Sequence, residues 1–371
     1  MKSLAILAHD FGDGGVERMV INTCNGLAER GVTVYLLMSD VRARFIDALS
    51  PQVRLITLGR EHPQARVVDF LREHQPGVMI TAKLTDDALA LRARTQAGLR
   101  TPLYFRVGNP LVGRLLARSR NPLRRWWQIR SMRQLYAQAD GCIAVSRGIG
   151  TDLVENLKVP PSKVHVLPNP TVTPTLFEQA RQTPAHRWFE GADAGLPVVL
   201  GIGGLRKQKN FGVLVQAFAQ VRARRPCRLL ILGDGRQRQR LLTLAARLGV
   251  GDDVDLPGWQ TNPYAYMARA SVFALSSLWE GSPNVLVEAA ALGVPVVAAD
   301  CVGGGARDIL QDGRCGEIVP PNDAAALAAA ISRALETPLP AERIREAATP
   351  FTVANSAAAY IRALGLDPPA G

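Results

Sequence analysis

The segment Ser277-Leu278-Trp279-Glu280-Gly281-Ser282-Pro283-Asn284-Val285-Leu286-Val287-Glu288-Ala289 indicates both the class of fold and the place of a ligand site. It follows an apolar run, residues 270–276, that is typical of a buried strand. It leads into residues 285–292, whose spacing predicts a helix that ends at Gly293. Strands that pass through a short turn into a helix build α/β sheets, and ligands of such sheets bind at these turns.

Two glutamates flank the turn. Glu280 is predicted on the loop after the strand, and Glu288 in the first turns of the helix. A helix start offers unpaired N–H groups and a positive dipole end, which suit a phosphate, and carboxylates accept hydrogen bonds from hydroxyls. This pattern predicts a ligand with both phosphate and sugar hydroxyls. In the alternative interpretation, Glu280 caps the turn and Glu288 is a solvated helix residue.

The length of 371 residues predicts two domains of about 150 to 200 residues each, and hence a cleft between them. No run of eighteen apolar residues occurs and the first residues lack a signal-peptide pattern, so we expect a cytoplasmic protein. The cysteines and histidines have no disulfide-framework or metal-ligand spacing. They are Cys24, Cys142, Cys227, Cys301 and Cys315, and His9, His62, His74, His165 and His186. We expect reduced, mostly buried thiols, and histidines that are surface or hydrogen-bonding residues.

Short apolar runs alternate with helix-length segments, which predicts an α/β protein with two doubly wound parallel sheets. The predicted strands of the first domain are 4–8, 32–38, 53–58, 78–81, 103–107, 141–145 and 164–167. Those of the second are 198–202, 228–232, 253–256, 272–275, 295–299 and 316–319, with helices at 211–224, 236–248, 263–268, 285–292 and 324–335. Residues 171–196 have no clear period and are interpreted as a linker and the entry into the second domain. We predict domains at 1–172 and 173–350, and a C-terminal helix within 351–371 that crosses back to the first domain.

The net charge of +12 predicts an anionic partner. Between Ala88 and Ala139 there is no acidic residue, yet arginines recur at 92, 94, 100, 106, 114, 118, 120, 124, 125, 130 and 133. Adjacent tryptophans within residues 123–130 are typical of helices that lie on a membrane surface, so segment 114–133 is predicted to bind an anionic membrane. The alternative is a solvated helix with one tryptophan in the core. No nucleic-acid partner is expected, because no recognised module is present.

Further loops close the other predicted strands. In the first domain, residues 9–17 include Gly12, Gly14 and Gly15, which would let the backbone approach a ligand. A dinucleotide site is poorly supported, because Gly-x-Gly-x-x-Gly is absent and Asp40 alone could end the second strand. In the second domain, residues 201–211 bring cations to a strand end, where they could clamp a diphosphate.

In this order, the pieces resemble the retaining nucleotide-sugar glycosyltransferases of family 4, which have the GT-B type fold of two Rossmann-like domains facing each other across a cleft. The resemblance covers nearly the whole chain. Its most specific motifs are Gly-x-Leu-x-x-x-Lys from Gly203, Leu232-Gly233-Asp234-Gly235, Leu256-Pro257-Gly258-Trp259, Glu-Gly-x-Pro-x-x-x-x-Glu from Glu280, and Gly293-Val294-Pro295-Val296-Val297. It implies transfer of a hexose or N-acetylhexosamine from a nucleoside-diphosphate sugar, with a UDP-sugar expected. The implied acceptor is lipid-linked, a lipopolysaccharide or a polysaccharide, at the inner membrane surface, and no cofactor is implied.

The resemblance also implies residue roles. Glu280, Arg206 and Lys209 form the catalytic set: Glu280 binds hydroxyls of the transferred sugar, and the two cations neutralise the departing diphosphate, the main catalytic device of such a site. Glu288 holds the ribose hydroxyls. The other implied donor-binding residues are Gly15, Gly233, Gly235, Trp259, Ser282, Pro283, Asn284, Val285 and Leu286. Gly14 and Asn109 lie on the acceptor or sugar side.

This sequence departs from the family pattern at two positions. Gly204 stands where relatives usually carry arginine, and Arg206, two positions on, would have to supply the cation. Asn109 stands near the place of a usual histidine and can hydrogen-bond but cannot act as an acid or base. The alternative function is therefore a catalytically impaired protein that acts as a basic membrane- or anion-binding module. We expect no metal, because Asp253 and Asp255 would point to opposite sides of a strand.

Overall fold

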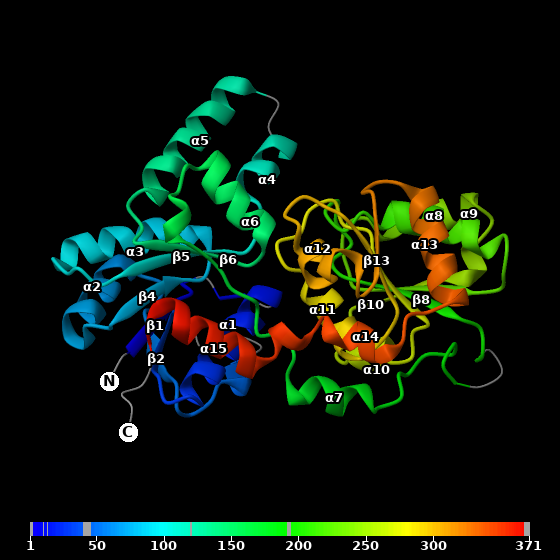
Figure 1. The fold of residues 1–371 in the computed structure, drawn as a ribbon, viewed down its shortest axis with the longest axis horizontal. Coiled ribbons are helices and arrows are strands. Elements are labelled where there is room, and N and C mark those ends of the chain that lie inside the picture. The colour runs from blue at the N-terminus through cyan, green and yellow to red at the C-terminus, as the bar shows by residue number, and fades with distance from the viewer. Residues whose placement is uncertain are drawn as a thin grey trace. The chain divides into compact units, whose positions relative to one another are not determined.

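The computed structural model describes residues 3–9, 11–12, 14–39, 46–118, 121–190 and 194–366, without the side chains of 114 and 116–118. Some residues named in the sequence analysis lie outside this part: Asp10 and Asp13 of the first loop, Asp40, and residues 119–120 of the predicted basic segment. The chain divides into two compact units (Figure 1): unit 1 comprises residues 1–171 and 351–371, and unit 2 comprises 172–350.

The sheet of unit 1 consists of the seven strands predicted from the sequence. They are β1 (Ser3–Leu7), β2 (Thr33–Met38), β3 (Arg54–Thr57), β4 (Val78–Thr81), β5 (Leu103–Val107), β6 (Gly141–Ala144) and β7 (Val164–Val166). All neighbours are parallel, in the order β3-β2-β1-β4-β5-β6-β7. The order reverses between β1 and β4, so the chain winds outward in both directions from the centre, as doubly wound sheets do.

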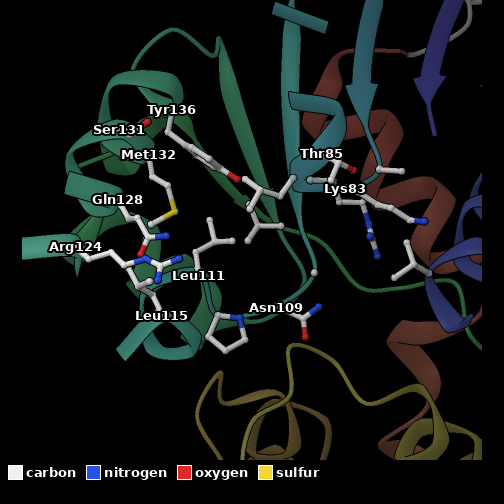
Figure 2. A pocket seen from close by; sticks show the side chains of 17 residues that line it. Lys83, Thr85, Asn109, Leu111, Leu115, Arg124, Gln128, Ser131, Met132 and Tyr136 are labelled. Atoms are coloured by element: carbon white, nitrogen blue, oxygen red, sulfur yellow. The ribbon is translucent and has the colours of Figure 1, made fainter. Parts of the chain in front are cut away.

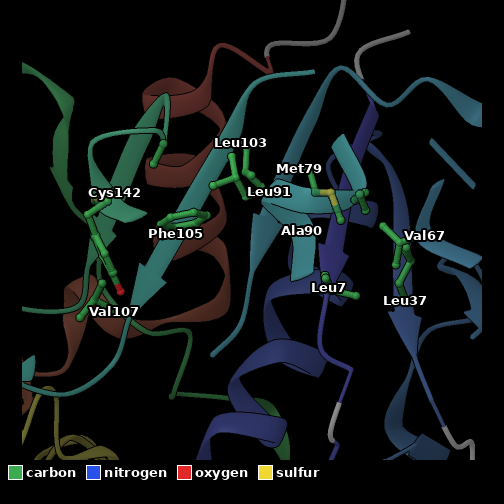
Figure 3. Packing of buried hydrophobic residues seen from close by; sticks show 14 of the residues in the cluster. Leu7, Leu37, Val67, Met79, Ala90, Leu91, Leu103, Phe105, Val107 and Cys142 are labelled. Carbon is green, nitrogen blue, oxygen red and sulfur yellow. The ribbon is translucent and has the colours of Figure 1, made fainter. Parts of the chain in front are cut away.

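Helices cover both faces of this sheet. They are α1 (Gly15–Ala28), α2 (Pro63–His74), α3 (Leu84–Ala97), α4 (Leu111–Arg118), α5 (Pro122–Tyr136), α6 (Arg147–Thr151), the π-helical turn η2 (Asp152–Asn156) and α15 (Val353–Leu364). Alternate side chains of β1 belong to two different hydrophobic cores, one on each face of the sheet. Ala5 and Leu7 belong to the core that α2 and α3 cover (Figure 3), and Leu4 and Ile6 belong to the core that α1 and α15 cover. A strand buried on both faces explains the unbroken apolar runs in the sequence.

The chain leaves unit 1 and returns to it at one place. The N–H of Thr171 donates to the carbonyl of Phe351 at 2.8 Å, and the Ser356 hydroxyl donates to the carbonyl of Pro168 at 2.7 Å. From there α15 packs against α1, within unit 1.

Unit 2 repeats the architecture with the six predicted strands. They are β8 (Val198–Ile202), β9 (Arg228–Leu232), β10 (Val254–Gly258), β11 (Val272–Leu275), β12 (Val296–Ala299) and β13 (Glu317–Val319), parallel in the order β10-β9-β8-β11-β12-β13. Its helices are α7 (Pro174–Ala180), α8 (Phe211–Arg222), α9 (Arg238–Arg247), α10 (Pro263–Met267), α11 (Asn284–Ala291), α12 (Gly305–Ile309), α13 (Ala324–Glu336) and α14 (Ala341–Glu346). The prediction of two doubly wound α/β domains is confirmed.

Residues 171–196, interpreted from the sequence as a linker and the entry into the second domain, contain helix α7, which the lack of a period did not reveal. Helix α7 begins at a proline in its first turn, buries Leu176 completely, and its Gln179 carbonyl accepts a hydrogen bond from the side chain of Asn262 at 2.9 Å. Trp188, further along, is also buried. Only a few buried residues, such as Leu176 and Trp188, pack this segment against unit 2, and they are too widely spaced to give a periodic apolar pattern.

Candidate functional site

The strand order of unit 2 reverses between β8 and β11, and the loops that follow these two strands are bonded to each other. The N–H of Leu278 donates to the carbonyl of Gln208 at 2.8 Å, and the Ser276 hydroxyl donates to the carbonyl of Lys209 at 2.8 Å. In doubly wound sheets, ligands bind outside the carboxyl ends of the strands at such a reversal. The fold therefore brings both loops to the expected place of a ligand.

These bonds bring Glu280 and Lys209 together. The Lys209 ammonium lies 2.7 Å from Glu280 Oε1, which also accepts from the Ser277 hydroxyl at 2.8 Å. The Gln208 side chain donates to the other carboxylate oxygen at 3.4 Å. Glu280 is only 7% exposed, so little water screens the pair. Lys209 uses one of its three N–H donors on this carboxylate, and the others can serve an anion.

A glycine makes the path of Lys209 possible. Gly203 has a φ of +149°, and a Cβ atom there would lie 2.6 Å from Cε of Lys209. A side chain at 203 would therefore strain this backbone conformation and require Lys209 to shift.

Arg206 occupies the space beside the departure at Gly204. A Cβ atom at 204 would lie 3.4 Å from Nε of Arg206, and the side chain of Arg206 is exposed. The side chain of Arg206 therefore runs past the place that a side chain at 204 would enter. Its role in binding a diphosphate stays a prediction.

The loops after β8, β9 and β10 pack backbone against backbone. A Cβ atom on Gly233, whose φ is +132°, would lie 2.2 Å from the carbonyl oxygen of Gly203. The N–H of Leu205 donates to the carbonyl of Asp234 at 2.8 Å, and the Asp234 carboxylate accepts from the N–H of Trp259 at 2.9 Å. The predicted donor-binding residues Gly233, Gly235 and Trp259 thus belong to one block of loops, with the Trp259 ring exposed.

Glu288 is 1% exposed, so the interpretation of this residue as a solvated helix side chain is wrong. It projects from α11 into the interior, where the Tyr264 hydroxyl donates to its Oε1 at 3.3 Å. A buried carboxylate is costly unless hydrogen-bond donors surround it, which favours a specific task for this side chain.

The start of α11 is open to an oxygen-rich ligand. Pro283 occupies the N-cap position and provides no side-chain cap. Within the described ranges, the buried hydroxyl of Ser282 has no hydrogen-bond partner. The turn rests on the first residue of α12, because a Cβ atom on Gly305 would lie 2.0 Å from the carbonyl of Gly281. First-turn amides and a hydroxyl near Glu280 are groups that phosphate and sugar oxygens need.

Sequence reasoning missed three residues that organise this site. Ser277 and Gln208 bind the carboxylate of Glu280, and Val302 accepts from the backbone N–H of Glu280 at 2.9 Å. For the first two, the available signal was a polar residue close in sequence to a predicted site residue: Ser277 lies three residues before Glu280, and Gln208 directly precedes Lys209. No signal marked Val302, because it contributes only its carbonyl.

The glycine-rich loop of unit 1 is organised by Glu17. Its carboxylate accepts from the N–H groups of Gly12 at 3.1 Å and Gly14 at 3.0 Å, and Lys83 lies 2.5 Å from Oε1. Burial alone would raise the pKa of Glu17, but the hydrogen bond from Lys83 and those from the backbone outweigh it and lower the pKa. Gly15 begins α1. Contacts of Gly14 and Gly15 with a ligand stay a prediction.

Unit 1 also contains a cavity of about 880 Å³ beside the end of β5 (Figure 2). Asn109 lines it, together with residues of α4 and α5. Pockets of roughly 300–1,000 Å³ are the usual size for small-molecule ligands. The predicted acceptor-side residue Asn109 therefore borders a space large enough for a substrate.

The two carboxylates of the Asp253-Val254-Asp255 motif bind different residues. Asp253 pairs with Arg222 at 2.6 Å and Arg228 at 2.9 Å, whereas Asp255 lies 3.1 Å from Nε2 of His186. No group of three or more potential metal ligands occurs within the described ranges.

None of the described helices is long and apolar enough to cross a membrane.

Comparison with known proteins identifies two family models. Residues 13–173 match the model described as Glycosyltransferase Family 4, and residues 182–350 match that of Glycosyl transferases group 1. A Campylobacter jejuni N-acetylgalactosamine-N,N'-diacetylbacillosaminyl-diphospho-undecaprenol 4-alpha-N-acetylgalactosaminyltransferase is 34% identical over 50% of this chain, and the match covers 48% of that relative's length. The Rhizobium meliloti lipopolysaccharide core biosynthesis glycosyltransferase LpsD is 27% identical over 90% of this chain and 89% of its own length.

The fold has close structural counterparts. The crystal structure of Anabaena HepE in complex with UDP and glucose superposes with a TM-score of 0.78, covering 98% of this chain and 100% of that one at 20% sequence identity. At that identity the likeness shows the fold, which is of the GT-B type.

Proposed function

We propose, because this chain belongs to the glycosyltransferases of group 1 and family 4, that it moves a hexose or N-acetylhexosamine from a nucleoside-diphosphate sugar to a lipid-linked, lipopolysaccharide or polysaccharide acceptor. The observation that carries the proposal is the pair of Lys209 and Glu280 at 2.7 Å, on the loops beside the start of α11, which has no side-chain cap. A cation, a carboxylate and helix amides at one strand reversal match the mixed chemistry of a nucleotide sugar.

Each group then has a task in binding the donor. Lys209 and Arg206 neutralise the diphosphate, and the N–H groups of Ser282 and Val285, at the turn into α11, hold its oxygens. Pro283 has no N–H, and that of Leu286 donates to the Pro283 carbonyl at 3.0 Å. Glu280 accepts hydrogen bonds from the transferred sugar, and Glu288 from the ribose. UDP is the proposed nucleotide, supported by the structural counterpart that binds UDP and glucose.

The proposed reaction retains the configuration of the sugar. The bond between the sugar C1 and the diphosphate oxygen breaks, and the acceptor oxygen bonds to C1 from the same face, while its proton passes to the departing phosphate. Cations positioned at the developing negative charge lower the barrier without a metal ion. Lys209 and Arg206 are the groups of this chain that supply that charge.

The acceptor is proposed to reach the protein from an anionic membrane surface, to which unit 1 binds as a peripheral protein of the cytoplasm. Leu123, Trp126 and Trp127, at helical spacings of three and four, share one face of α5, and the tryptophans are 55% and 63% exposed. The alternative with one tryptophan in the core is therefore wrong. Arg130 lies over the Trp126 ring at 5.6 Å, so cation and aromatic groups meet on this face. Such a combination favours the headgroup region of an anionic bilayer.

A thermal-shift screen of the full chain against UDP, GDP, ADP and their sugar conjugates tests the proposal, because a ligand that binds only the folded state raises the melting temperature. We expect a shift with UDP and a UDP-sugar that is lost in Lys209→Met. A cooperative melt that no nucleotide shifts would contradict the proposed function and favour a catalytically impaired binding module.

A further inference from the structure

A buried arginine in unit 1 has an unsatisfied nitrogen. Arg106, near the end of β5, is 8% exposed, and its Nη2 donates to Oδ1 of Asn169 at 2.6 Å. Nη1 is shielded from solvent and has no hydrogen-bond partner in the part of the chain that the structure describes. A guanidinium held away from water without a carboxylate is unfavourable, and an anion that binds it removes this penalty.

This arginine borders the cavity of unit 1. A Cβ atom on Gly108 would lie 3.6 Å from Nη1, in van der Waals contact, so glycine at this position leaves that side of the guanidinium without a covering side chain. Lys83, another cation of the lining, is already paired with Glu17. Among the described residues that line the cavity, Arg124 adds a third positive charge and none is acidic. The cavity is therefore an electropositive space with an unused donor.

Apolar side chains of two helices form another part of the lining. Leu111 and Leu115 of α4 and Met132 of α5 face the cavity, on the side where Arg124 and Gln128 also lie (Figure 2). Positions 124, 128 and 132 follow one face of α5, whereas the exposed tryptophans lie on another. One helix thus presents aromatic groups outward and covers an apolar space with its other face.

We propose that this cavity binds a phosphate ester of an amphiphile, with the phosphate against Nη1 of Arg106 and the hydrocarbon against α4 and α5. The planar guanidinium suits phosphate oxygens, and about 880 Å³ exceeds what a phosphate alone would occupy. The inference rests on the proposed function, because it assigns the acceptor to the class of lipid phosphates.

Calorimetric titration of the full chain with three probes tests this, with UDP present to occupy the donor site. The probes are octyl phosphate, 1-octanol and inorganic phosphate, all below any micelle concentration. We expect octyl phosphate to bind at least about tenfold more tightly than either of the others, since only it offers both parts. Equal binding of octyl phosphate and 1-octanol would overturn the anion site. Equal binding of octyl phosphate and inorganic phosphate would overturn the lipid and leave a free-phosphate site.

Arg106→Gln then identifies the residue, with Arg100→Gln as the matched control, since Arg100 is exposed and does not line the cavity. Arg106→Gln should weaken octyl phosphate at least about tenfold, and Arg100→Gln should leave it unchanged. An equal loss in both variants, or in neither, would contradict the proposal.

The UDP-induced melting shift separates this inference from the proposed function. A normal shift in Arg106→Gln, with octyl phosphate binding lost, supports the acceptor site. A lost UDP shift in a folded variant would assign Arg106 to the donor instead and overturn the inference. If Arg106→Gln fails to fold, Arg124→Gln on the exposed helix should still weaken octyl phosphate, and the comparison of headgroups on the unmodified chain decides.

Discussion

Lys209 and Glu280, 71 residues apart in the chain, meet at 2.7 Å where the strand order of unit 2 reverses. Unit 1 repeats this arrangement, because Lys83 meets Glu17 at 2.5 Å where its own strand order reverses between β1 and β4. In both units an ion pair ties the two loops that diverge at this point. The loops at the proposed ligand site are thus held together by an ion pair in each unit.

Breaking the pair in unit 2 should impair donor use. Lys209→Met leaves the carboxylate of Glu280, 7% exposed, without its cation and removes a positive charge from the proposed diphosphate site. We expect kcat/KM for the donor to fall at least about tenfold, or about 1.4 kcal/mol, in steady-state assays. Lys207→Met, an exposed lysine of the same loop, is the control. Equal kinetics in both variants would refute the assignment of Lys209.

Glu288→Gln should remove the preference of the protein for a nucleotide whose ribose carries its 2′- and 3′-hydroxyls. The amide keeps the packing of this buried side chain but is a weaker acceptor for hydroxyls than a carboxylate. The unmodified chain should bind UDP at least about tenfold more tightly than 2′,3′-dideoxy-UDP, and the variant should bind both alike. Discrimination that survives the substitution, as measured by calorimetry, would place the ribose elsewhere.

Arg206→Gln asks whether this exposed residue replaces the arginine that is absent at Gly204. Because its Nε lies 3.4 Å from where a Cβ atom at 204 would be, we expect kcat to fall about tenfold or more with little change in melting temperature. The variant Gly204→Arg/Arg206→Gln should recover part of the lost activity. Unchanged kcat in Arg206→Gln would show that Lys209 alone serves the diphosphate.

The tryptophan face of α5 should control membrane binding. Trp126→Ser/Trp127→Ser removes exposed aromatic groups, so we expect co-sedimentation with vesicles of anionic phospholipid to fall severalfold and UDP binding to persist. Phe177→Ser removes an exposed aromatic residue of unit 2 and serves as the control. Added salt should weaken the binding of the unmodified chain. Vesicle binding that depends equally on Phe177 would contradict this surface.

Stability should depend on pH through Asp87. Burial raises the pKa of this carboxyl to about 7 from 3.8, although hydrogen bonds from Thr81 and Tyr136 act in the opposite direction. The folded state thus binds a proton more tightly than the unfolded state between pH 3.8 and 7, so the free energy of unfolding falls as pH rises through this window.

Asp87→Asn removes this titration, and the asparagine amide can accept a hydrogen bond from one of the two neighbouring hydroxyls and donate to the other. We expect it to raise the free energy of unfolding at pH 8 by on the order of 2 kcal/mol, and by less at pH 4.5. Urea denaturation at both values measures the difference, and Asp69→Asn, on the exposed side of α2, is the control. A variant that is less stable than the unmodified chain at pH 8 would refute a raised pKa.

The strands were predictable because parallel sheets bury both faces and leave unbroken apolar runs such as residues 198–202. The turn around Glu280 was predictable because strand, glycine, proline and helix follow in order. For Ser277 and Gln208 the sequence showed only polar residues near Glu280 and Lys209; that both bind the Glu280 carboxylate depends on how the side chains pack, which the sequence pattern does not encode. The free nitrogen of Arg106 was hidden for the same reason: a strand arginine has no pattern that reveals whether it is paired.

The hydrogen bond from Thr171 to Phe351 places the two crossings of the chain next to each other in unit 1. Unit 2 is therefore inserted into the chain of unit 1, between β7 and α15. Recombination between related genes at these two codons would exchange the whole of unit 2, which contains the proposed donor site, while leaving unit 1 intact. The same two positions offer junctions for building chimeric proteins that test whether unit 2 chooses the sugar and unit 1 the acceptor.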